Sequence, residues 1–256
     1  MRGPSLREMP TRPLQAARPF LVQQKYEDYT VDQHELWGEL VRRRCAQLEQ
    51  LACDEYWEGF DAIGLGERCV PVLADVSLRL RRRTGWSSTP VSGFMPARAF
   101  FEMLSARMFP TTTRLRQREA AEYTPEPDIF HDVFGHVPMH AHQGFADFLQ
   151  YYGKVCAGLE NPDALEKLGR LFWYTVEFGV IRERGEIRLY GSGLISSHEE
   201  STNVLEGKVE VRPFDLDEVL ETPVKVDQVH QLVFVIESFD QIYEAMERVA
   251  LLVAEQ

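Results

Sequence analysis

The sequence predicts a mainly helical (α+β) fold in which a few short strands accompany the helices. Apolar residues recur at helical spacing in successive segments between residues 30 and 185. After that the apolar pattern shifts toward a period of two, which is typical of short strands, before one last helical segment. The chain has 256 residues, 44% of them hydrophobic and 27% charged, so it is long enough to bury a core without disulfide bonds.

Two helices are predicted in the first third of the chain. The first is expected to begin after Thr30, because Thr30 and Gln33 have the pattern of a capping box. Its apolar residues recur at helical spacing as far as Tyr56, and its aromatic residues are interpreted as core packing. The second is expected to begin at Pro71 and to end in a run of arginines before Gly85, where cations face the negative end of the helix dipole.

Prolines divide the middle of the chain. Residues 90–96 are predicted to form a loop, and Pro96 is predicted to open a helix that runs to about Met108. Residues 129–136 follow two prolines and are expected to form a short helix, since proline can begin a helix but cannot continue one. Residues 144–157 again show helical spacing.

The last part of the chain combines one long helix, several strands and a final helix. Asn161 and Pro162 form a cap-then-proline helix start, and this helix is expected to run to Gly185. A capping box at Ser238 and Gln241 is expected to open the final helix. Short strands are predicted at residues 186–190, 208–214, 223–229 and 232–238.

The composition of the chain indicates its domain organisation, its compartment and the classes of partner that it can bind. Residues 1–24 are rich in proline and arginine and are expected to form a flexible arm before a single domain at residues 25–256. The net charge of −12 argues against nucleic acid or an anionic membrane as a partner. The four cysteines form no CxxC pair, which fits the reducing cytoplasm. No membrane-length apolar run, secretory signal, P-loop or GxGxxG motif is present.

Four of the seven histidines lie within residues 123–142, and histidine is the commonest metal ligand. His131 and His136 are separated by five positions, which places them about 140° apart on a regular α-helix. The HExxH motif of zinc proteases instead spaces its histidines by four. The two imidazoles are therefore expected to reach one metal ion only if the helix loosens near Gly135 and stops before Pro138.

Glu177 is the predicted third ligand, because it interrupts an apolar stretch where a carboxylate is costly to bury unless it is paired or binds a metal. Two imidazoles and one carboxylate form the facial triad of non-haem Fe(II) oxygenases. On the residues alone, Glu177 could also pair with an arginine, and the histidines could satisfy core hydrogen bonds. His140 is the alternative ligand. The histidines outside the pair are interpreted as surface or loop residues: His140, His142, His198 and His230.

Three longer motifs together resemble the pterin-dependent aromatic amino acid hydroxylases, in particular their bacterial, phenylalanine-hydroxylating members. They are YTPEPDIFHDVFGHVP at 123–138, WYTVEFG at 173–179 and YGSGLISS at 190–197. The resemblance covers most of residues 25–245 and implies a single basket-like helical catalytic domain with a few short β-ribbons. It implies Fe(II) and tetrahydrobiopterin or a related tetrahydropterin as cofactors, with O2 as co-substrate. Because the chain lacks the regulatory domain and tetramerisation helix of animal members, a monomer is expected.

The resemblance also assigns residues to the two binding sites. Arg116 matches the arginine that binds the amino acid carboxylate, for which a guanidinium fork is suited, and Arg114 and Arg118 are its rivals. Glu200 matches a carboxylate that supports the site. The residues that match backbone contacts and the wall around the aromatic ring are Thr124, Ser196, Pro125, Trp173 and Phe178. Those that match the pterin site are Gly93, Phe94, Ala97, Phe100 and, through water, Asp132.

Two positions favour phenylalanine as the substrate. Tryptophan hydroxylases have phenylalanine at the position of Trp173, and tyrosine hydroxylases have aspartate at that of Val226. Phe94 departs from the usual leucine, and tryptophan hydroxylases carry an aromatic residue there. The expected reaction is 4-hydroxylation of L-phenylalanine to L-tyrosine, with 5-hydroxylation of tryptophan or meta-hydroxylation of phenylalanine as alternatives. Rivals from other classes are a zinc hydrolase with the same three ligands and a non-catalytic pterin-binding or interaction protein.

Overall fold

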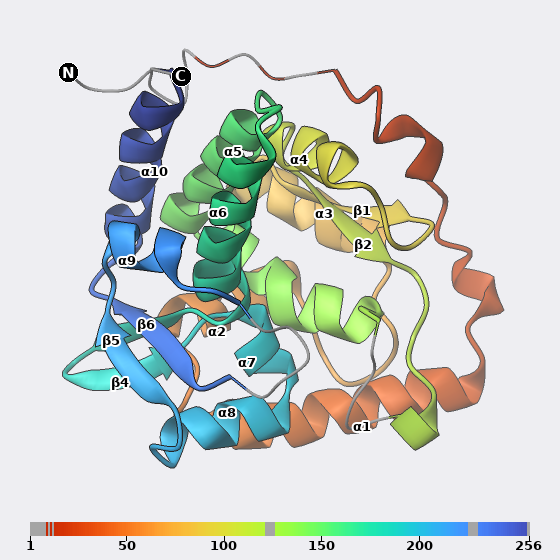
Figure 1. The fold of residues 1–256 in the computed structure, drawn as a ribbon. Helices are drawn as coiled ribbons and strands as arrows, with labels where there is room; N and C mark the ends of the chain where they lie inside the picture. The colour runs from red at the N-terminus through yellow and green to blue at the C-terminus, as the bar shows by residue number, and fades with distance from the viewer. Residues whose placement is uncertain (1–8, 10, 12, 121–125, 225–229, 255–256) are drawn as a thin grey trace.

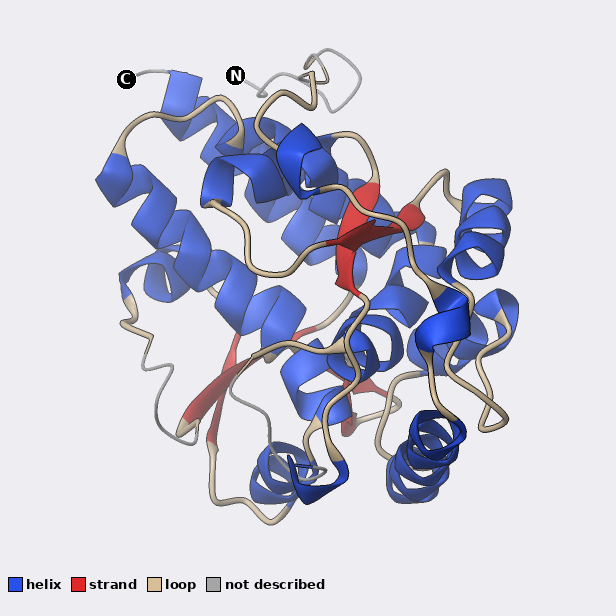
Figure 2. Cartoon of the chain, turned by 90° about the vertical axis from the view of Figure 1, so that its right-hand side faces the viewer, coloured by secondary structure: helices blue, strands red, loops and turns tan. Residues whose placement is uncertain are grey.

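The structure, a computed structural model, describes residues 9, 11, 13–120, 126–224 and 230–254. Helices make up most of it and surround a short helical segment near the centre, so the predicted mainly helical (α+β) fold is confirmed (Figure 1, Figure 2). Among the described residues, no helix is long and apolar enough to cross a bilayer. The α-helices are α1 (Val31–Leu48), α2 (Asp54–Ile63), α3 (Leu73–Arg83), α4 (Ala97–Ser105), α5 (Gln143–Cys156), α6 (Pro162–Phe172), α7 (Ser192–Ser196), α8 (His198–Leu205), α9 (Leu216–Glu221) and α10 (Phe239–Ala254).

The described strands form two small sheets. The first is the parallel pair β1-β2, and the second has the order β4-β3-β6-β5. In the second sheet β3 and β4 are antiparallel, whereas β6 pairs in parallel with both β3 and β5. The strands are β1 (Ser87–Val91), β2 (Met108–Thr112), β3 (Val180–Glu183), β4 (Glu186–Leu189), β5 (Glu210–Pro213) and β6 (Leu232–Ile236).

The central segment consists of the π-helix η4 (Phe130–His136) and the 3₁₀-helix η5 (Val137–Ala141). The rings of Phe130 and Phe134 stack within it, with centroids 4.8 Å apart. From α2, the buried hydroxyl of Tyr56 donates a hydrogen bond to the carbonyl oxygen of Phe134. A Cβ on Gly59 would lie 2.0 Å from the carbonyl oxygen of Pro138, so only glycine allows α2 to pack this closely. These contacts hold the central segment against α2.

Two predicted helix caps are confirmed, at α1 and α6, whereas at the start of α10 the side chain of Gln241 accepts the backbone N–H of Glu237 instead of that of Ser238. The side chain of Thr30 accepts the backbone N–H of Gln33, and the side chain of Gln33 accepts that of Thr30, which completes the predicted capping box of α1. The side chain of Asn161 accepts the backbone N–H groups of Asp163 and Ala164 at the start of α6. Both caps satisfy donors that the helix itself leaves unpaired.

The prediction of one continuous helix from Thr30 to Tyr56 is wrong, because α1 ends at Leu48 and α2 begins at Asp54. Between them, the backbone N–H of Cys53 donates to the carbonyl of Leu189, and the N–H of Leu189 donates to the carbonyl of Leu51. The backbone groups of residues 51 and 53, which a continuous helix would pair within itself, are thus hydrogen-bonded to a distant segment.

The helix predicted from Pro96 to Met108 is shorter than expected and ends at Ser105. Arg107 has a φ of 56°, and Met108 begins β2. The predicted loop at 90–96 also overlaps the end of β1. Both strands form because β1 and β2 pair with each other. Neither short segment has a sequence pattern that predicts this pairing.

The helix predicted from Pro162 to Gly185 is also wrong in its second half. The α-helical hydrogen bonding of α6 ends at Phe172 and is followed by the π-helix η6 (Trp173–Glu177) and then by β3. Gly185, with a φ of 86°, lies in the tight turn between β3 and β4. This early end of the helix places Glu177 at the boundary between a helix and a sheet.

The C-terminal third contains more helix than predicted. The expected strands at 186–190, 208–214 and 232–238 are confirmed as β4, β5 and β6. The segments between them also contain α7, α8 and α9, which were not predicted. Residues 225–229 of the strand expected at 223–229 lie outside the described residues.

The described part of the predicted flexible arm is packed against the domain. Ala17 is fully buried, and the backbone N–H groups of Ala16 and Ala17 donate to one carboxylate oxygen of Glu102 in α4. Leu21 forms an isolated antiparallel bridge with Val91 of β1. A free arm is therefore the wrong description for residues 14–21, because they bury apolar side chains and satisfy a buried carboxylate.

Candidate active site

His131 and His136 lie on the π-helix η4. A π-helix bonds residue i to residue i+5, so residues five apart come to the same side of it. The Nε2 atoms of the two imidazoles are 3.2 Å apart. The predicted departure from regular α-geometry is confirmed, and it extends along η4 rather than being confined to Gly135.

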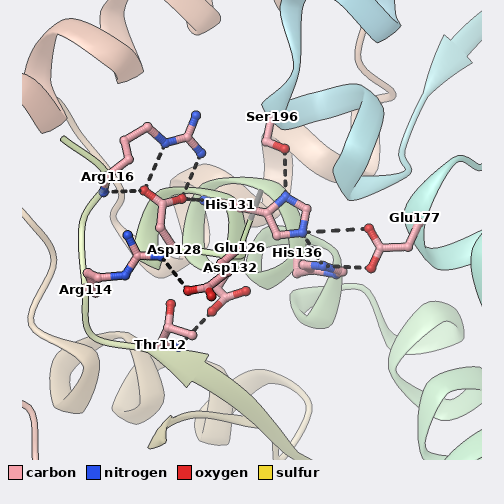
Figure 3. Close-up of polar contacts among 10 residues, drawn as sticks. All are labelled: Thr112, Arg114, Arg116, Glu126, Asp128, His131, Asp132, His136, Glu177 and Ser196. Carbon is pink, nitrogen blue, oxygen red and sulfur yellow. Dashed lines mark hydrogen bonds and ion pairs between the residues drawn. The ribbon is translucent and has the colours of Figure 1, made fainter. Parts of the chain in front are cut away.

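Glu177, the last residue of η6, completes a group of three possible ligands. Its Oε1 lies 3.3 Å from Nε2 of His136, and its Oε2 lies 3.7 Å from Nε2 of His131 (Figure 3). The candidate donor atoms of the three residues all lie within 4.8 Å of one another. The predicted set of two histidines and one glutamate therefore converges on one point that could hold a single metal ion.

The YGSGLISS motif orients two of these ligands from α7. Ser196 Oγ lies 2.8 Å from Nδ1 of His131, which leaves Nε2 to face the centre of the site. Ser192 Oγ donates to Oε2 of Glu177 at 2.7 Å. A Cβ on Gly191 would lie 2.5 Å from the carbonyl oxygen of Glu177, so glycine is required for this close approach. Such supporting contacts fix the direction of metal-binding side chains.

The electrostatics of the three residues suit metal binding. Burial alone would raise the pKa of Glu177, but His136, His131 and the hydroxyl of Ser192 bring it down to about 2. Burial and the neighbouring His136 lower the pKa of His131 to about 4. At neutral pH Glu177 is therefore charged and His131 is neutral, as ligands must be. A nitrogen and oxygen donor set without thiolate suits Fe(II).

A second group, Cys53, Glu55 and Glu183, also brings possible donors within 4.8 Å of one another. Burial raises the pKa of the Cys53 thiol well above its usual value. Burial and the neighbouring Glu55 raise the pKa of Glu183 to about 7. These groups retain protons near neutral pH, so the histidine–glutamate group is the better metal site.

Arg116 is tied to the metal group through Asp128. Its guanidinium donates to both carboxylate oxygens, from Nε to Oδ2 at 2.9 Å and from Nη2 to Oδ1 at 2.8 Å (Figure 3). Asp128 Oδ1 also accepts the backbone N–H of His131 at 3.0 Å. The rivals Arg114 and Arg118 instead pair with more exposed carboxylates. These contacts favour Arg116 for the carboxylate-binding role.

Trp173 and Phe178 flank Glu177, at the start of η6 and just after its end. Their ring centroids are 5.0 Å apart with an interplanar angle of 36°. The two rings therefore pack against each other on either side of Glu177 along the chain, and their role as a wall around the substrate ring stays a prediction. Thr124, Pro125 and Val226 lie outside the described residues.

The residues assigned to the pterin lie on the loop between β1 and α4 and on α4 itself. Gly93 has a φ of 133°, and a Cβ built on it would meet nothing within 4 Å. The ring of Phe94 is 98% exposed, and Ala97 is exposed too. Phe100 is half-buried and packs edge-on against Phe172. An open glycine beside an uncovered aromatic ring suits a flat heteroaromatic ligand.

Asp132 points away from the three ligands. Its Oδ2 accepts the backbone N–H of Thr112 at 2.7 Å (Figure 3). Burial raises its pKa to about 7. Its role toward the pterin stays a prediction.

Two of the histidines interpreted as surface or loop residues have buried side chains. The interpretation is wrong for His140, which lies in η5, whereas His230 does lie in a loop. His140 is fully buried against Trp86, and its Nδ1 lies 2.9 Å from the carbonyl oxygen of His136. The side chain of His230 is 8% exposed and stacks on Phe178. The contact of His140 with His136 could have been predicted from their spacing of four residues. The residues around His230 in the sequence give no indication of its contact with Phe178.

We predict that Ser192→Ala lowers iron affinity about tenfold, because Glu177 loses the hydroxyl that orients its carboxylate. Iron affinity is measured by competition with a chelator of known strength. Ser197→Ala is the matched control, since the Ser197 side chain caps α8 and makes no described contact with the three ligands. Equal iron affinity in the two variants would contradict the supporting role of Ser192.

Comparisons with known proteins show the family of the chain. Residues 22–255 match the family described as biopterin-dependent aromatic amino acid hydroxylase. The chain is 39% identical to a phenylalanine-4-hydroxylase of Chromobacterium violaceum over 90% of this chain and 77% of that protein. It is 40% identical to one of Mesorhizobium japonicum over 89% of this chain and 83% of that protein.

Solved structures show the same similarity. The Chromobacterium violaceum phenylalanine hydroxylase with bound Fe(III) superposes with a TM-score of 0.88 and 37% identity, covering 93% of this chain and 89% of that one. The same protein with iron(III) and 7,8-dihydrobiopterin gives a TM-score of 0.87 at 37% identity, covering 93% of this chain and 88% of that one.

Proposed function

This chain belongs to the biopterin-dependent aromatic amino acid hydroxylases, and from that premise we propose that it is a phenylalanine 4-monooxygenase. It converts L-phenylalanine to L-tyrosine with O2 and a tetrahydropterin at a non-haem Fe(II). The relatives named phenylalanine-4-hydroxylase, at 39% and 40% identity, support this substrate.

One observation carries the proposal. The two π-helices η4 and η6 bring the donor atoms of His131, His136 and Glu177 within 4.8 Å of one another, at the junction of the aromatic wall and the Arg116–Asp128 pair. Three protein ligands on one side leave other coordination positions open, as oxygen chemistry requires. A metal position, a carboxylate-binding cation and an aromatic wall are the parts needed to place an aromatic amino acid beside iron.

In this proposal His131, His136 and Glu177 hold the iron. The bound iron and tetrahydropterin supply the activation of O2 for ring hydroxylation. Arg116 holds the substrate carboxylate, while Asp128 keeps the guanidinium oriented. Trp173 and Phe178 place the ring beside the metal and exclude water, which turns the reaction into one between oriented groups.

Within the same proposal, the pterin lies at Gly93, Phe94, Ala97, Phe100 and Asp132, while Thr124, Pro125 and Ser196 contact the amino acid. We also propose a single catalytic domain that acts as a monomer in the cytoplasm. The four free cysteines are compatible with a reducing compartment.

The assay uses purified protein with Fe(II), O2, a reduced pterin and L-phenylalanine, with products separated by chromatography. L-tyrosine is the expected product, and omission of iron or pterin is expected to abolish it. Formation of meta-tyrosine would contradict the proposed regiochemistry. Preferential conversion of L-tryptophan to 5-hydroxytryptophan would contradict the proposed substrate. No hydroxylated product from protein with demonstrably bound iron would overturn the proposal.

A further inference from the structure

His230 connects the aromatic wall to Glu200, although it follows the wall residues by more than 50 positions. Nε1 of Trp173 donates a hydrogen bond to Nε2 of His230 at 2.5 Å. On the other edge of the imidazole, Nδ1 lies 3.4 Å from Oε1 of Glu200. The backbone N–H of His230 donates to the second oxygen of the same carboxylate, also at 3.4 Å.

These contacts determine the tautomer of His230. An indole N–H is only a donor, so Nε2 of His230 must be the acceptor and carry no proton. The proton of the neutral ring is then on Nδ1 and is directed at the carboxylate of Glu200. The imidazole is therefore held at both nitrogens, and Trp173, His230 and Glu200 form one hydrogen-bonded bridge.

The imidazole of His230 also stacks on Phe178. The two ring centroids are 3.5 Å apart with an interplanar angle of 21°. The ring of Trp173 lies 5.3 Å from His230 and 5.0 Å from Phe178, with an interplanar angle of 36° to each. Each of the two wall residues thus contacts His230, and Phe178 directly follows the metal ligand Glu177.

We propose that His230 is a positioning residue that sets the angle of the aromatic wall, acting through its bridge from Trp173 to Glu200. The inference rests on the proposed function, because the wall angle determines which carbon of the substrate ring lies nearest the metal. A loose wall weakens substrate binding and lets pterin oxidation proceed without hydroxylation of the amino acid. Iron binding does not depend on the bridge, since Trp173, His230 and Glu200 make no described contact with the side chains of the three ligands.

Three variants and one control test the proposal. His230→Ala removes the bridge and the stack, His230→Gln keeps an acceptor for Trp173 and a donor for Glu200, and His230→Phe keeps only an aromatic ring. His198→Ala is the control, because His198 is an exposed histidine on the same helix as Glu200. The measurements are KM and kcat for phenylalanine, the yield of tyrosine per pterin oxidised, iron affinity and the thermal midpoint.

His230→Ala is expected to raise the KM about tenfold, the loss of roughly one hydrogen bond, and to lower the tyrosine yield. His230→Gln is expected to restore most of the KM and of the tyrosine yield, whereas His230→Phe is expected to restore neither quantity. Iron affinity is expected to stay unchanged in all three variants. Full rescue by His230→Phe without rescue by His230→Gln would overturn the bridge, as would a KM and tyrosine yield unaffected by His230→Ala.

A double-mutant cycle separates this inference from the proposed function. If His230 acts through the indole N–H, His230→Ala has little further effect on KM in a Trp173→Phe background; additive effects would overturn the inference. The near-ultraviolet circular dichroism that Trp173→Phe removes from the spectrum reports the order of Trp173 without any turnover. A signal lost in His230→Ala and retained in His230→Gln supports the bridge even if the protein makes no tyrosine, whereas a signal unchanged in His230→Ala overturns it.

Discussion

Glu177→Ala is expected to abolish turnover and to lower iron affinity more than about 100-fold, the upper end of the effect of removing a mere supporting contact. Glu177 is the one charged ligand of the three, and its carboxylate oxygens lie 3.3 Å and 3.7 Å from the two imidazoles. Without it, two neutral imidazoles remain to hold a divalent cation, which is too few for a stable site. Iron content after gel filtration and kcat with phenylalanine measure the effect.

The fold is expected to survive this change. Glu177 ends η6, and its removal loses the hydrogen bond from Ser192 and the contacts with the two imidazoles, whereas the backbone contacts around Gly191 remain. Circular dichroism and the thermal midpoint of the iron-free protein should stay close to those of the unmodified chain. Glu186→Ala, an exposed glutamate in β4, is the matched control and should keep iron and activity. Full activity in Glu177→Ala would show that the ligand set is misassigned.

Asp128→Ala is expected to lower the free energy of unfolding by about 3–5 kcal/mol, because it removes the buried carboxylate that pairs with the guanidinium of Arg116. The side chains of Asp128 and Arg116 are 0% and 5% exposed, so water cannot replace the lost partner. Asp128 also accepts the backbone N–H of His131, so the start of η4 is expected to loosen. Urea unfolding of the iron-free protein measures the stability.

The exposed ion pair between Asp32 and Arg118 provides the control for this prediction. Asp32→Ala removes one exposed carboxylate from Arg118, which keeps a second partner in Glu39, and it should change the stability far less. Asp128→Asn keeps the shape of the side chain and should be less damaging than Asp128→Ala. Equal stabilities of the Asp128 and Asp32 variants would contradict the importance of the buried pair.

The contribution of Asp128 should also depend on pH. Burial alone would raise the pKa of Asp128, but the hydrogen bonds and charge of Arg116, with the backbone N–H of His131, lower it below 3.8. A carboxyl whose pKa is lower in the folded state stabilises the protein above its unfolded pKa, and this stabilisation is lost as the pH falls through the folded pKa. The stability difference between the unmodified chain and Asp128→Asn should therefore be constant near pH 6 and shrink below about pH 4. A difference that grows on acidification would contradict this assignment.

Features that depend on neighbouring residues were predictable from the sequence. The capping box at Thr30 and the cap-then-proline start at Asn161 both form as expected, because each satisfies donors within a few residues. The three candidate metal ligands could also be named from the sequence, and the structure brings their donor atoms together. His131 and His136 lie within one motif, and a carboxylate in the apolar stretch around Glu177 needed a partner.

The tertiary structure decided the features that depend on distant contacts. The break between α1 and α2 exists because residues 51–53 pair with Leu189, and β1 exists because β2 lies beside it. The proposal of Arg116 rather than Arg114 or Arg118 for the carboxylate-binding role rests on its buried pairing with Asp128. The burial of the His140 and His230 side chains, both expected at the surface or in loops, follows from the residues that other segments place around them.

The sequence by itself thus determined the helical class of the fold and the capped starts of α1 and α6, and it indicated the three candidate metal ligands, since these features depend on local spacing and residue type. Only the tertiary structure decided how the ligands converge and which residues support them. The two π-helices, which are separate in sequence, must face each other, and α7 must place the hydroxyls of Ser192 and Ser196 against Glu177 and His131. His230 must accept the indole N–H of Trp173. These contacts join residues far apart along the chain, and their geometry is the outcome of packing the whole core.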